Sequence, residues 1–260
     1  MIYILIVSIF TIILQLFVIL KYRKIVANNK LVVASVTHDL KNPIKAQINV
    51  LNLLLKGDFG MLNTKQYEML SLTSNASNYM FELVNTILSG YECESANFHL
   101  NKSEFDIVEL VKNVCNDNMP LSRQKGQSVI LNYSLQKCFI YADKLQIERV
   151  ISNLLSNAIA YGTEDSTITI NLIKNANFVD FSISNHSFYI SDRELREIFG
   201  KFTKIKMGES AKTSSGFGLY VAKKIIDMHN GKIYAKSTKE GICTFGFCLK
   251  LNKIKEIQKV

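Results

Sequence analysis

Apolar residues recur at three- and four-residue steps through the first third of the chain. One such run covers residues 24–56, and a second continues to about residue 89. This spacing places an apolar stripe along one face of a helix, and the glycines within residues 57–60 signal a turn between the two runs. The pattern predicts a helical hairpin whose helices meet along an apolar seam. The predicted seam consists of Val33, Val36, Leu40, Ile44, Ile48, Leu51 and Leu55 on the first helix and Met69, Leu72, Ala76, Met80, Leu83 and Ile87 on the second.

A hairpin of this kind buries only one stripe on each helix, which is little apolar surface for a stable unit. Two such hairpins can cover each other's stripes as a four-helix bundle. We therefore expect the hairpin to pair with its copy from a second chain, and the pattern predicts a homodimer.

Beyond about residue 97 the pattern changes to short alternating segments mixed with amphipathic ones. Alternation with a period of two predicts strands, whereas steps of three and four residues predict helices. Helices and hairpin-connected strands in this order favour an α+β fold, a two-layer sandwich with helices on one face of a mixed sheet. We place the boundary between the two parts near residues 92–101. The expected helices are 105–116, 144–161, 192–199 and 218–228, and the expected strands are 129–135, 167–173, 178–184, 232–237 and 244–251.

The N-terminal residues 2–20 carry no charge and contain only three polar side chains. As a helix with a rise of about 1.5 Å per residue, this segment reaches roughly 28 Å, which spans the hydrocarbon core of a bilayer. Three of the residues 21–24 are basic, and the positive-inside rule places the chain beyond them in the cytoplasm. We expect a transmembrane helix at residues 1–21 that contacts membrane lipid and crosses the inner or plasma membrane once. A cleaved signal peptide is the alternative, although such peptides carry their charges before the apolar run.

The formal net charge of +9 comes from 31 Lys and Arg residues against 22 Asp and Glu residues, and it is concentrated at the two ends. Residues 1–30 contribute +4 and residues 250–260 contribute +3, which leaves +2 for the rest. A nucleic-acid-binding protein needs a basic stripe on a folded face, so we expect no nucleic-acid partner. The five cysteines contain no C-x-x-C pair, which favours a reducing compartment. Cys243 and Cys248 fall on opposite faces of one predicted strand, so no shared metal site is expected.

A polar cluster on the first predicted helix carries candidate chemistry. His38 is followed by Asp39, and Asn42 lies one helical turn further on. A neutral imidazole is a competent nucleophile near neutral pH, and an adjacent carboxylate can orient it and accept its ring proton. With the seam turned inward, His38 faces solvent, and Pro43 should bend the helix beside it. Taken alone, the pair also fits an ordinary surface histidine next to a helix kink.

Three stretches together resemble the sensor histidine kinases of two-component systems. Residues 35–43 resemble the H box, residues 153–158 the N box and residues 215–219 the second glycine box, in the order of that family. The resemblance extends over residues 28–251. It implies that His38 is phosphorylated, that Asp39 acts as the general base and that Asn42 assists a phosphatase activity.

The resemblance also implies a site for ATP and Mg²⁺ in the second part of the chain. Asn153 and Asn157 lie one turn apart on one helical face, and the carbonyl oxygen of Asn157 is best placed for Mg²⁺, which prefers oxygen ligands. Taken alone, this segment also fits a capped surface helix. Gly216 and Gly218 permit close backbone approach, and the helix start beside them offers N–H groups to phosphate oxygens. Further nucleotide-contacting residues implied by the resemblance are Tyr161, Asn185, Lys204, Leu219 and Thr244.

The chain departs from the family pattern at the first glycine box. The family's D-x-G-x-G motif falls on residues 185–189. In this chain Asn185 replaces the aspartate, and Ser187 and Tyr189 replace the two glycines. An asparagine oxygen can still accept from the adenine amine, but it lacks the charge that strengthens such a bond. Phe188 and Tyr189 add bulk where the nucleotide should bind. Two further positions differ from the family pattern: Ala160 replaces a common lysine, and Cys243 replaces Gly or Ser. His186 is expected to be an exposed loop residue.

We therefore expect a membrane-anchored, homodimeric sensor histidine kinase that phosphorylates His38 from ATP and passes the phosphoryl group to an aspartate of a response-regulator receiver domain. The expected parts are the anchor at 1–21, the dimerisation and phosphotransfer hairpin at 22–96, the ATP-binding domain at 97–252 and a basic tail at 253–260. One alternative is a degenerate kinase that acts as a response-regulator-binding module or a phosphatase. Another is a gyrase-like or chaperone-like ATPase without phosphotransfer, against which the H box argues.

Overall fold

The computed structural model describes residues 36–37, 39–93, 98–133, 136–201, 203 and 217–251. None of the helices within these residues is long and apolar enough to span a membrane. The chain divides into two compact units, with the division between Glu92 and Cys93. Several sequence predictions fall outside the described residues, namely the anchor at 1–21, His38, Lys204, Gly216 and the basic tail at 253–260.

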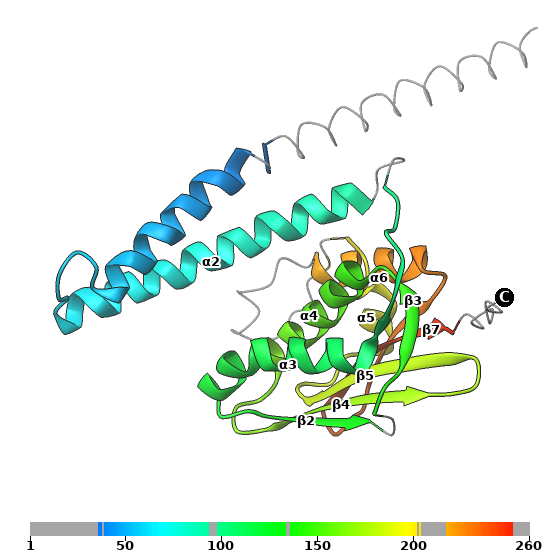
Figure 1. Cartoon of the computed structure of the whole chain (residues 1–260). Helices are drawn as coiled ribbons and strands as arrows, with labels where there is room; N and C mark the ends of the chain where they lie inside the picture. The colour runs from blue at the N-terminus through cyan, green and yellow to red at the C-terminus, as the bar shows by residue number, and fades with distance from the viewer. Residues whose placement is uncertain are drawn as a thin grey trace, which may run out of the picture. The chain divides into compact units, whose positions relative to one another are not determined.

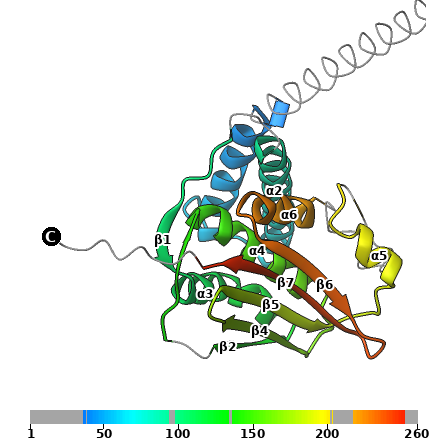
Figure 2. The ribbon, with the colours of Figure 1, turned by 90° about the vertical axis from the view of Figure 1, so that its right-hand side faces the viewer.

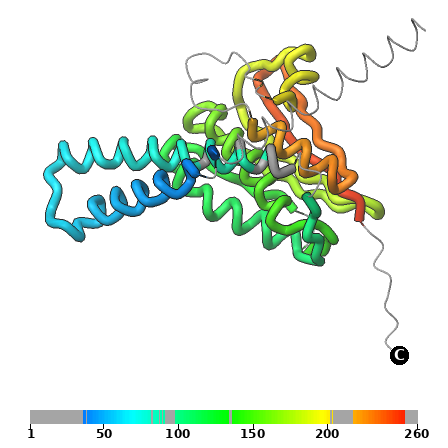
Figure 3. The backbone as a smooth tube through the Cα atoms, turned by 90° about the horizontal axis from the view of Figure 1, so that it is seen from above, coloured from blue at the N-terminus to red at the C-terminus, as the bar shows by residue number. Residues whose placement is uncertain are grey.

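The first unit contains the predicted helical hairpin. Residues 39–56 form its first helix, residues 57–59 form a turn, and α2 spans Thr64–Cys93. Figure 3 shows the two helices side by side. Asn63 caps α2, because its side-chain oxygen accepts from the N–H of Gln66 at 2.9 Å while Gln66 Oε1 accepts from the N–H of Asn63 at 3.0 Å. This reciprocal pair is the reason α2 begins at this point.

Within the single chain, several large apolar residues of the predicted seam are exposed. Val36 is 52% exposed, Met69 61% and Leu72 65%. Two small polar residues of α2, Ser74 and Ser77, are buried instead. Small side chains let two helix axes come close together, and the larger apolar side chains then remain on the outer faces. The exposed apolar residues also include Leu40, Val50, Leu53 and Met80, whereas Leu51 and Val84 are buried.

The second unit is an α+β sandwich of two layers, as predicted. Five strands form a mixed sheet in the order β2-β4-β5-β7-β6, in which β2 and β4 are parallel and the other neighbours antiparallel. Helices α3, α4 and α6 lie on one face of this sheet (Figures 1 and 2). The strands are β1 (Ser103–Asp106), β2 (Ser128–Tyr133), β3 (Phe139–Ala142), β4 (Thr167–Lys174), β5 (Phe178–His186), β6 (Lys232–Ser237) and β7 (Ile242–Lys250). The helices are α3 (Ile107–Gln124), α4 (Lys144–Tyr161), α5 (Asp192–Glu197) and α6 (Gly218–Met228).

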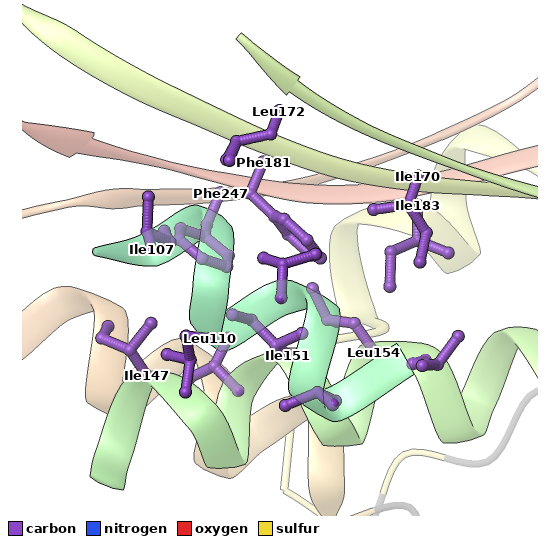
Figure 4. Close-up of a cluster of buried hydrophobic side chains, with 14 of the residues drawn as sticks. Ile107, Leu110, Ile147, Ile151, Leu154, Ile170, Leu172, Phe181, Ile183 and Phe247 are labelled. Carbon is purple, nitrogen blue, oxygen red and sulfur yellow. The ribbon is translucent and has the colours of Figure 1, made fainter. Parts of the chain in front are cut away.

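The core of the second unit lies between the sheet and the helices. Strand residues such as Phe181 and Phe247 point from the sheet toward Ile147 and Ile151 of α4 (Figure 4). The two phenylalanine rings stack with centroids 5.1 Å apart. Burial of this apolar surface is the main stabilising contribution to the unit. It holds α4 and α6 at fixed positions on the sheet.

A short antiparallel pair formed by β1 and β3 was not predicted. Phe105, expected to begin a helix, lies in β1, and α3 begins only at Ile107 because Asp106 caps it by accepting from the N–H of Val108 at 3.0 Å. The same carboxylate oxygen accepts from the N–H of Cys138 at 2.9 Å, which ties β1 to the start of β3. Strands of four residues are too short for alternation to reveal them.

Candidate functional site

The described residues of the predicted phosphotransfer motif lie in the first helix of the hairpin. Asp39, Asn42 and Pro43 are helical and exposed, whereas His38 lies outside the described residues. The ammonium of Lys41 lies 5.8 Å from the ring centroid of Phe81 on α2, so the two helices are in contact at this level. Exposed side chains on a helix can meet a partner molecule, which phosphotransfer would require.

The predicted N box and second glycine box come together in the structure. Asn153 of α4 donates from Nδ2 to the carbonyl of Gly218 at 3.3 Å, although 65 residues separate them in the sequence. A Cβ added to Gly218 would lie 3.6 Å from Cγ of Asn153, so the two helices approach closely here. This contact places the start of α6 against the polar face of α4.

The polar face of α4 is opposite its buried face. Ile151, Leu154 and Leu155 are buried, whereas Asn153 and Asn157 are half-buried. Tyr161, one turn beyond Asn157, is also half-buried, and so is Leu219 on α6. The predicted ligand residues therefore form one row along α4 beside the start of α6.

The start of α6 has the properties of an anion-binding helix end. Phe217, its N-cap residue, makes no side-chain capping hydrogen bond. The first N–H groups of a helix lack intrahelical partners, and together with the helix dipole they favour a negative charge. Phosphate oxygens are suitable ligands for such an end.

Lys201, which was not among the predicted site residues, lies near this helix start. Its ammonium lies 5.7 Å from the ring centroids of both Phe217 and Tyr220, at the first turn of α6. A cation at this position adds positive charge next to the start of α6.

At the C-terminus of α4, side chains from other elements hold the carbonyl groups that a helix end leaves without partners. Lys125 donates from Nζ to the carbonyls of Ile159 at 3.0 Å and Ala160 at 2.7 Å. Ser187 donates from Oγ to the carbonyl of Tyr161 at 2.9 Å. The cation also neutralises the negative end of the helix dipole. Further bonds run from Gly162 N to Ala158 O and from Gln127 Nε2 to Ile159, Gly162 and Thr163 O.

Asn185, the residue in place of the family's aspartate, lies next to this helix end. It is 4% exposed, and its Nδ2 donates to the carbonyl of His186 at 3.2 Å. A Cβ added to Gly162 would lie 3.6 Å from the same nitrogen and 2.6 Å from the carbonyl oxygen of Ala158, so only glycine fits between them. The bond to His186 fixes the amide with its nitrogen toward the backbone. His186 itself is exposed, as expected, but it ends β5 rather than lying in a loop.

The loop after β5 is held by several hydrogen bonds. Ser187 donates its N–H to the carbonyl of Gly241 at 2.7 Å. The thiol of Cys243 donates to the carbonyl of Phe188 at 3.3 Å, and Ser237 Oγ accepts from the N–H of Ile190 at 3.0 Å. Two of the residues that depart from the family pattern, Ser187 and Cys243, thus bond this loop in place. Phe188 and Tyr189 are 42% and 48% exposed.

Thr244 is not brought together with the other predicted site residues. Its hydroxyl lies 2.8 Å from that of Ser184, and by strand alternation both point away from the buried face that carries Asn185. The residue paired with Asn185 is Cys243, which the prediction did not select as a ligand. Burial raises the pKa of the Cys243 thiol, so it remains protonated and can donate.

Cys248 lies on the face opposite Cys243, as strand parity predicted. Its thiol donates to Asp180, and burial together with this bond raises the pKa of Cys248 to about 12. Tyr234 donates to the other carboxylate oxygen of Asp180 at 2.9 Å. Within the part of the chain that the structure describes, no cluster of three or more His, Cys, Asp or Glu side chains is arranged to hold a metal ion.

The donor set along α4 and α6 fits a magnesium nucleotide. Amide oxygens suit a hard cation, which keeps most of its coordination for water and phosphate. The N–H groups at the start of α6 and the ammonium of Lys201 suit the phosphate charge. Asn157 would hold the cation, and Gly218 with Leu219 would meet the phosphates.

Comparison with known proteins places this site in a family context. A family profile described as "Histidine kinase-, DNA gyrase B-, and HSP90-like ATPase" matches residues 142–253. This range contains α4, α6 and all of the candidate nucleotide residues. It does not include the hairpin.

Individual relatives extend the similarity to the hairpin. Histidine kinase P4 of Formosa agariphila is 25% identical over 203 residues, which cover 76% of this chain and 15% of that protein. Full-length ShkA in complex with AMPPNP has a TM-score of 0.68 at 18% identity, with 85% of this chain and 46% of that chain covered. ThkA in complex with the response regulator protein TrrA has a TM-score of 0.58 at 22% identity, with 84% and 61% covered. The chain thus spans only a small part of the curated relative it matches.

Proposed function

We propose that this chain, which belongs to the sensor histidine kinases and carries their GHKL-type ATPase domain, phosphorylates its own His38 from ATP and passes the phosphoryl group to an aspartate of a response-regulator receiver domain. The observation that carries the proposal is the junction of α4 and α6. There the Asn153 amide donates to the carbonyl of Gly218 at the first turn of α6. Relatives named as histidine kinases support the same activity.

In the proposed reaction a ring nitrogen of His38 attacks the γ-phosphorus of ATP. The new nitrogen–phosphorus bond forms as the bond to the β,γ-bridging oxygen breaks, and ADP leaves. Asp39 accepts the ring proton as the general base. Mg²⁺, when bound, neutralises charge on the phosphates. In phosphoryl transfer the protein mainly positions the reactants and neutralises charge. The polar side chains on α4 and the N–H groups at the start of α6 therefore supply most of the catalysis.

Asn42 is proposed to serve the opposing activity, in which water hydrolyses the phosphorylated response regulator. It is exposed one turn after His38. An amide at that position can orient a water molecule. A partner receiver domain is supported by the ThkA–TrrA complex, in which a related kinase is bound to a response regulator protein.

We propose that the hairpin forms a homodimer through its exposed apolar residues. Leu72 is 65% exposed and Met69 61% exposed on α2. A contiguous row of such residues marks an interaction surface in a soluble unit. A second copy covers it as a four-helix bundle.

The dimer can be tested by a charge on its proposed interface. Leu72→Glu should convert the purified protein to a monomer in light scattering, because a carboxylate buried without a partner is costly. Met61→Glu is the matched control, since Met61 is 102% exposed next to the hairpin turn. A dimer that survives Leu72→Glu, or one that is lost equally in both variants, would contradict this interface.

We also propose the remaining parts as the sequence suggests them. Residues 1–21 anchor the chain in the inner or plasma membrane with one pass, residues 22–96 form the dimerisation hairpin and residues 97–252 bind ATP in the cytoplasm. These proposals rest on the uncharged run at residues 2–20 and the basic residues directly after it.

The phosphotransfer itself can be tested with the full chain in detergent. We expect incubation with γ-labelled ATP and Mg²⁺ to give an acid-labile, alkali-stable label that is absent in His38→Gln. His99→Gln is the matched control, because His99 is exposed and lies outside the motif. Label that persists in His38→Gln would contradict the assignment of the phosphoacceptor. Absence of both label and nucleotide binding in the unmodified chain would favour the binding-module alternative.

A further inference from the structure

We propose that His229 is a positioning residue that clasps the two nucleotide-binding helices together and releases them when its imidazole takes up a proton. The inference rests on the proposed function, because α4 and α6 are the helices assigned there to the nucleotide. His229 follows the last residue of α6 and lies far along that helix from the candidate ligand residues.

The two helices are joined by a hydrogen bond near each end of their contact. At one end Asn153 Nδ2 donates to the carbonyl of Gly218 at 3.3 Å. At the other end the backbone N–H of Asp143 donates to Nε2 of His229 at 3.0 Å. From Asp143 to Asn153 and from Gly218 to His229 the helices rise by similar lengths, about 15 and 16 Å. The helices therefore run antiparallel, and the His229 bond is the counterpart of the bond at the site.

The hydrogen bonds of His229 define its protonation state. Nε2 accepts from the N–H of Asp143, so it carries a lone pair. Nδ1 lies 2.7 Å from the carbonyl oxygen of Ile225, which can only accept, so Nδ1 carries the proton. The bonded ring is therefore neutral. An imidazolium would direct a second N–H at the N–H of Asp143, and this bond would be lost.

Asp143 connects the clasp to the start of α4. Its Oδ1 accepts from the N–H of Gln146 at 3.2 Å and thereby caps the helix. Its Oδ2 accepts from the N–H of Asn101 at 2.9 Å, in the segment that leads into β1. The carbonyl of Asp143 accepts from the N–H of Ile147 at 2.9 Å. A change at His229 thus acts directly on the residue that sets where α4 begins.

The surroundings of the ring favour its neutral form. Burial lowers the pKa of His229, the carbonyl of Ile225 raises it, the ammonium of Lys102 lowers it and the carboxylate of Asp143 raises it. These groups face the ring from α6, from the segment before β1 and from the cap of α4. Because the folded-state pKa is lowered, the unfolded chain binds more protons. The clasp therefore stabilises the unit fully above the ordinary histidine pKa of about 6.5 and loses this contribution as the pH falls below it.

Release of the clasp should weaken nucleotide binding without removing any ligand group. One neutral hydrogen bond changes an equilibrium constant between about twofold and tenfold. We expect the dissociation constant for the nucleotide to rise by a factor in this range when the clasp opens.

The experiment measures the dissociation constant of a fluorescent ATP analogue with Mg²⁺ on the full chain between pH 5.5 and pH 8. Binding is measured because His38, the proposed phosphoacceptor, titrates in the same range and would alter turnover. His229→Gln supplies an amide oxygen that accepts from Asp143 and does not titrate. His229→Leu fills the space without an acceptor. His186→Gln is the control for an exposed histidine.

The clasp predicts that binding by the unmodified chain and by His186→Gln weakens as the pH falls, that His229→Gln gives a flat profile, and that His229→Leu binds weakly at every pH. The proposal is overturned if His229→Gln loses affinity at acid pH as much as the unmodified chain does. Normal affinity in His229→Leu would also overturn it. If nucleotide binds to none of the proteins, the proposed function fails. Urea unfolding then decides the clasp alone, because equal loss of stability at acid pH in the unmodified chain and His229→Gln would overturn it.

Discussion

The α4–α6 junction and the loop after β5 border the same candidate site, but they relate to the family pattern in opposite ways. At the junction the expected residues are present, and Asn153 bonds Gly218 across the two helices. In the loop the expected acid and glycines are replaced by Asn185, Ser187 and Tyr189. Nevertheless, hydrogen bonds hold both regions in place. Ser187 bonds Tyr161 and Cys243 bonds Phe188.

A departure from a motif therefore does not by itself mean that the local structure is lost. A glycine makes no side-chain contact, whereas a serine in its place can satisfy the carbonyl of a helix end. The replacement at Asn185 is likewise supported locally, because its amide nitrogen bonds the His186 carbonyl. The loop is therefore held beside α4 by hydrogen bonds, with side chains that differ from those of the family pattern. Substitutions on each side can test whether the two regions serve one nucleotide site.

The largest effect is expected at the junction side. Asn157→Ala removes the proposed Mg²⁺ ligand and should lower the rate of autophosphorylation on the order of 100-fold, because charge stabilisation in the transition state is lost. The measurement is the initial rate of label incorporation at saturating Mg²⁺. Ser156→Ala, an exposed neighbour on the same helix, should retain the rate. A similar loss in both variants would indicate damage to α4 rather than to a ligand.

A smaller effect is expected from restoring the family's acid in the loop. Asn185→Asp places a carboxylate oxygen against the carbonyl of His186, where an N–H donor now lies at 3.2 Å. Loss of that bond and repulsion between the oxygens should lower the free energy of unfolding by about 2 kcal/mol, measured in urea. Stability equal to that of the unmodified chain would mean that the amide orientation is not required.

The smallest effect is expected from restoring a glycine. Ser187→Gly removes the bond to the Tyr161 carbonyl and should lower the free energy of unfolding by about 1 kcal/mol, with no gain in nucleotide affinity. Ser166→Gly makes the same change outside this loop, because the hydroxyl that it removes bonds the carbonyl of Thr163 in an exposed turn, and it is the matched control. If Ser187→Gly instead binds nucleotide several-fold more tightly, the side chain obstructs the site and the interpretation of the loop is wrong.

The sequence predicted elements best where capping groups and periodicity agree. The predicted bounds of α4 and α6 are those found, because Asp143 caps α4 and an apolar face of several turns identifies each helix. The pair β1 and β3 was missed, since two four-residue strands show no clear alternation. Predicted helix 105–116 ended before Pro120, whereas α3 continues through this proline to Gln124.

Contacts between distant residues could not be predicted in the same way. Apolar spacing does not say which residues of the stripe meet the other helix of the same chain. Ser74 and Ser77 are buried there, whereas Met69 and Leu72 are exposed. Thr244 was implied by the family resemblance alone. The register of β7 against β5, which pairs Cys243 with Asn185, is not visible in the sequence. Lys125 gave no signal, since its partners at the end of α4 lie 34 and 35 residues away.

The most direct test of the account is a calorimetric titration of the full chain in detergent with a non-hydrolysable ATP analogue, in the presence and absence of Mg²⁺. We predict a submillimolar dissociation constant that requires Mg²⁺ and is lost in Asn157→Ala. Such a result would mean that the junction and the altered loop form one working nucleotide site. No binding by the unmodified chain, or binding equally tight without Mg²⁺ and in Asn157→Ala, would contradict it.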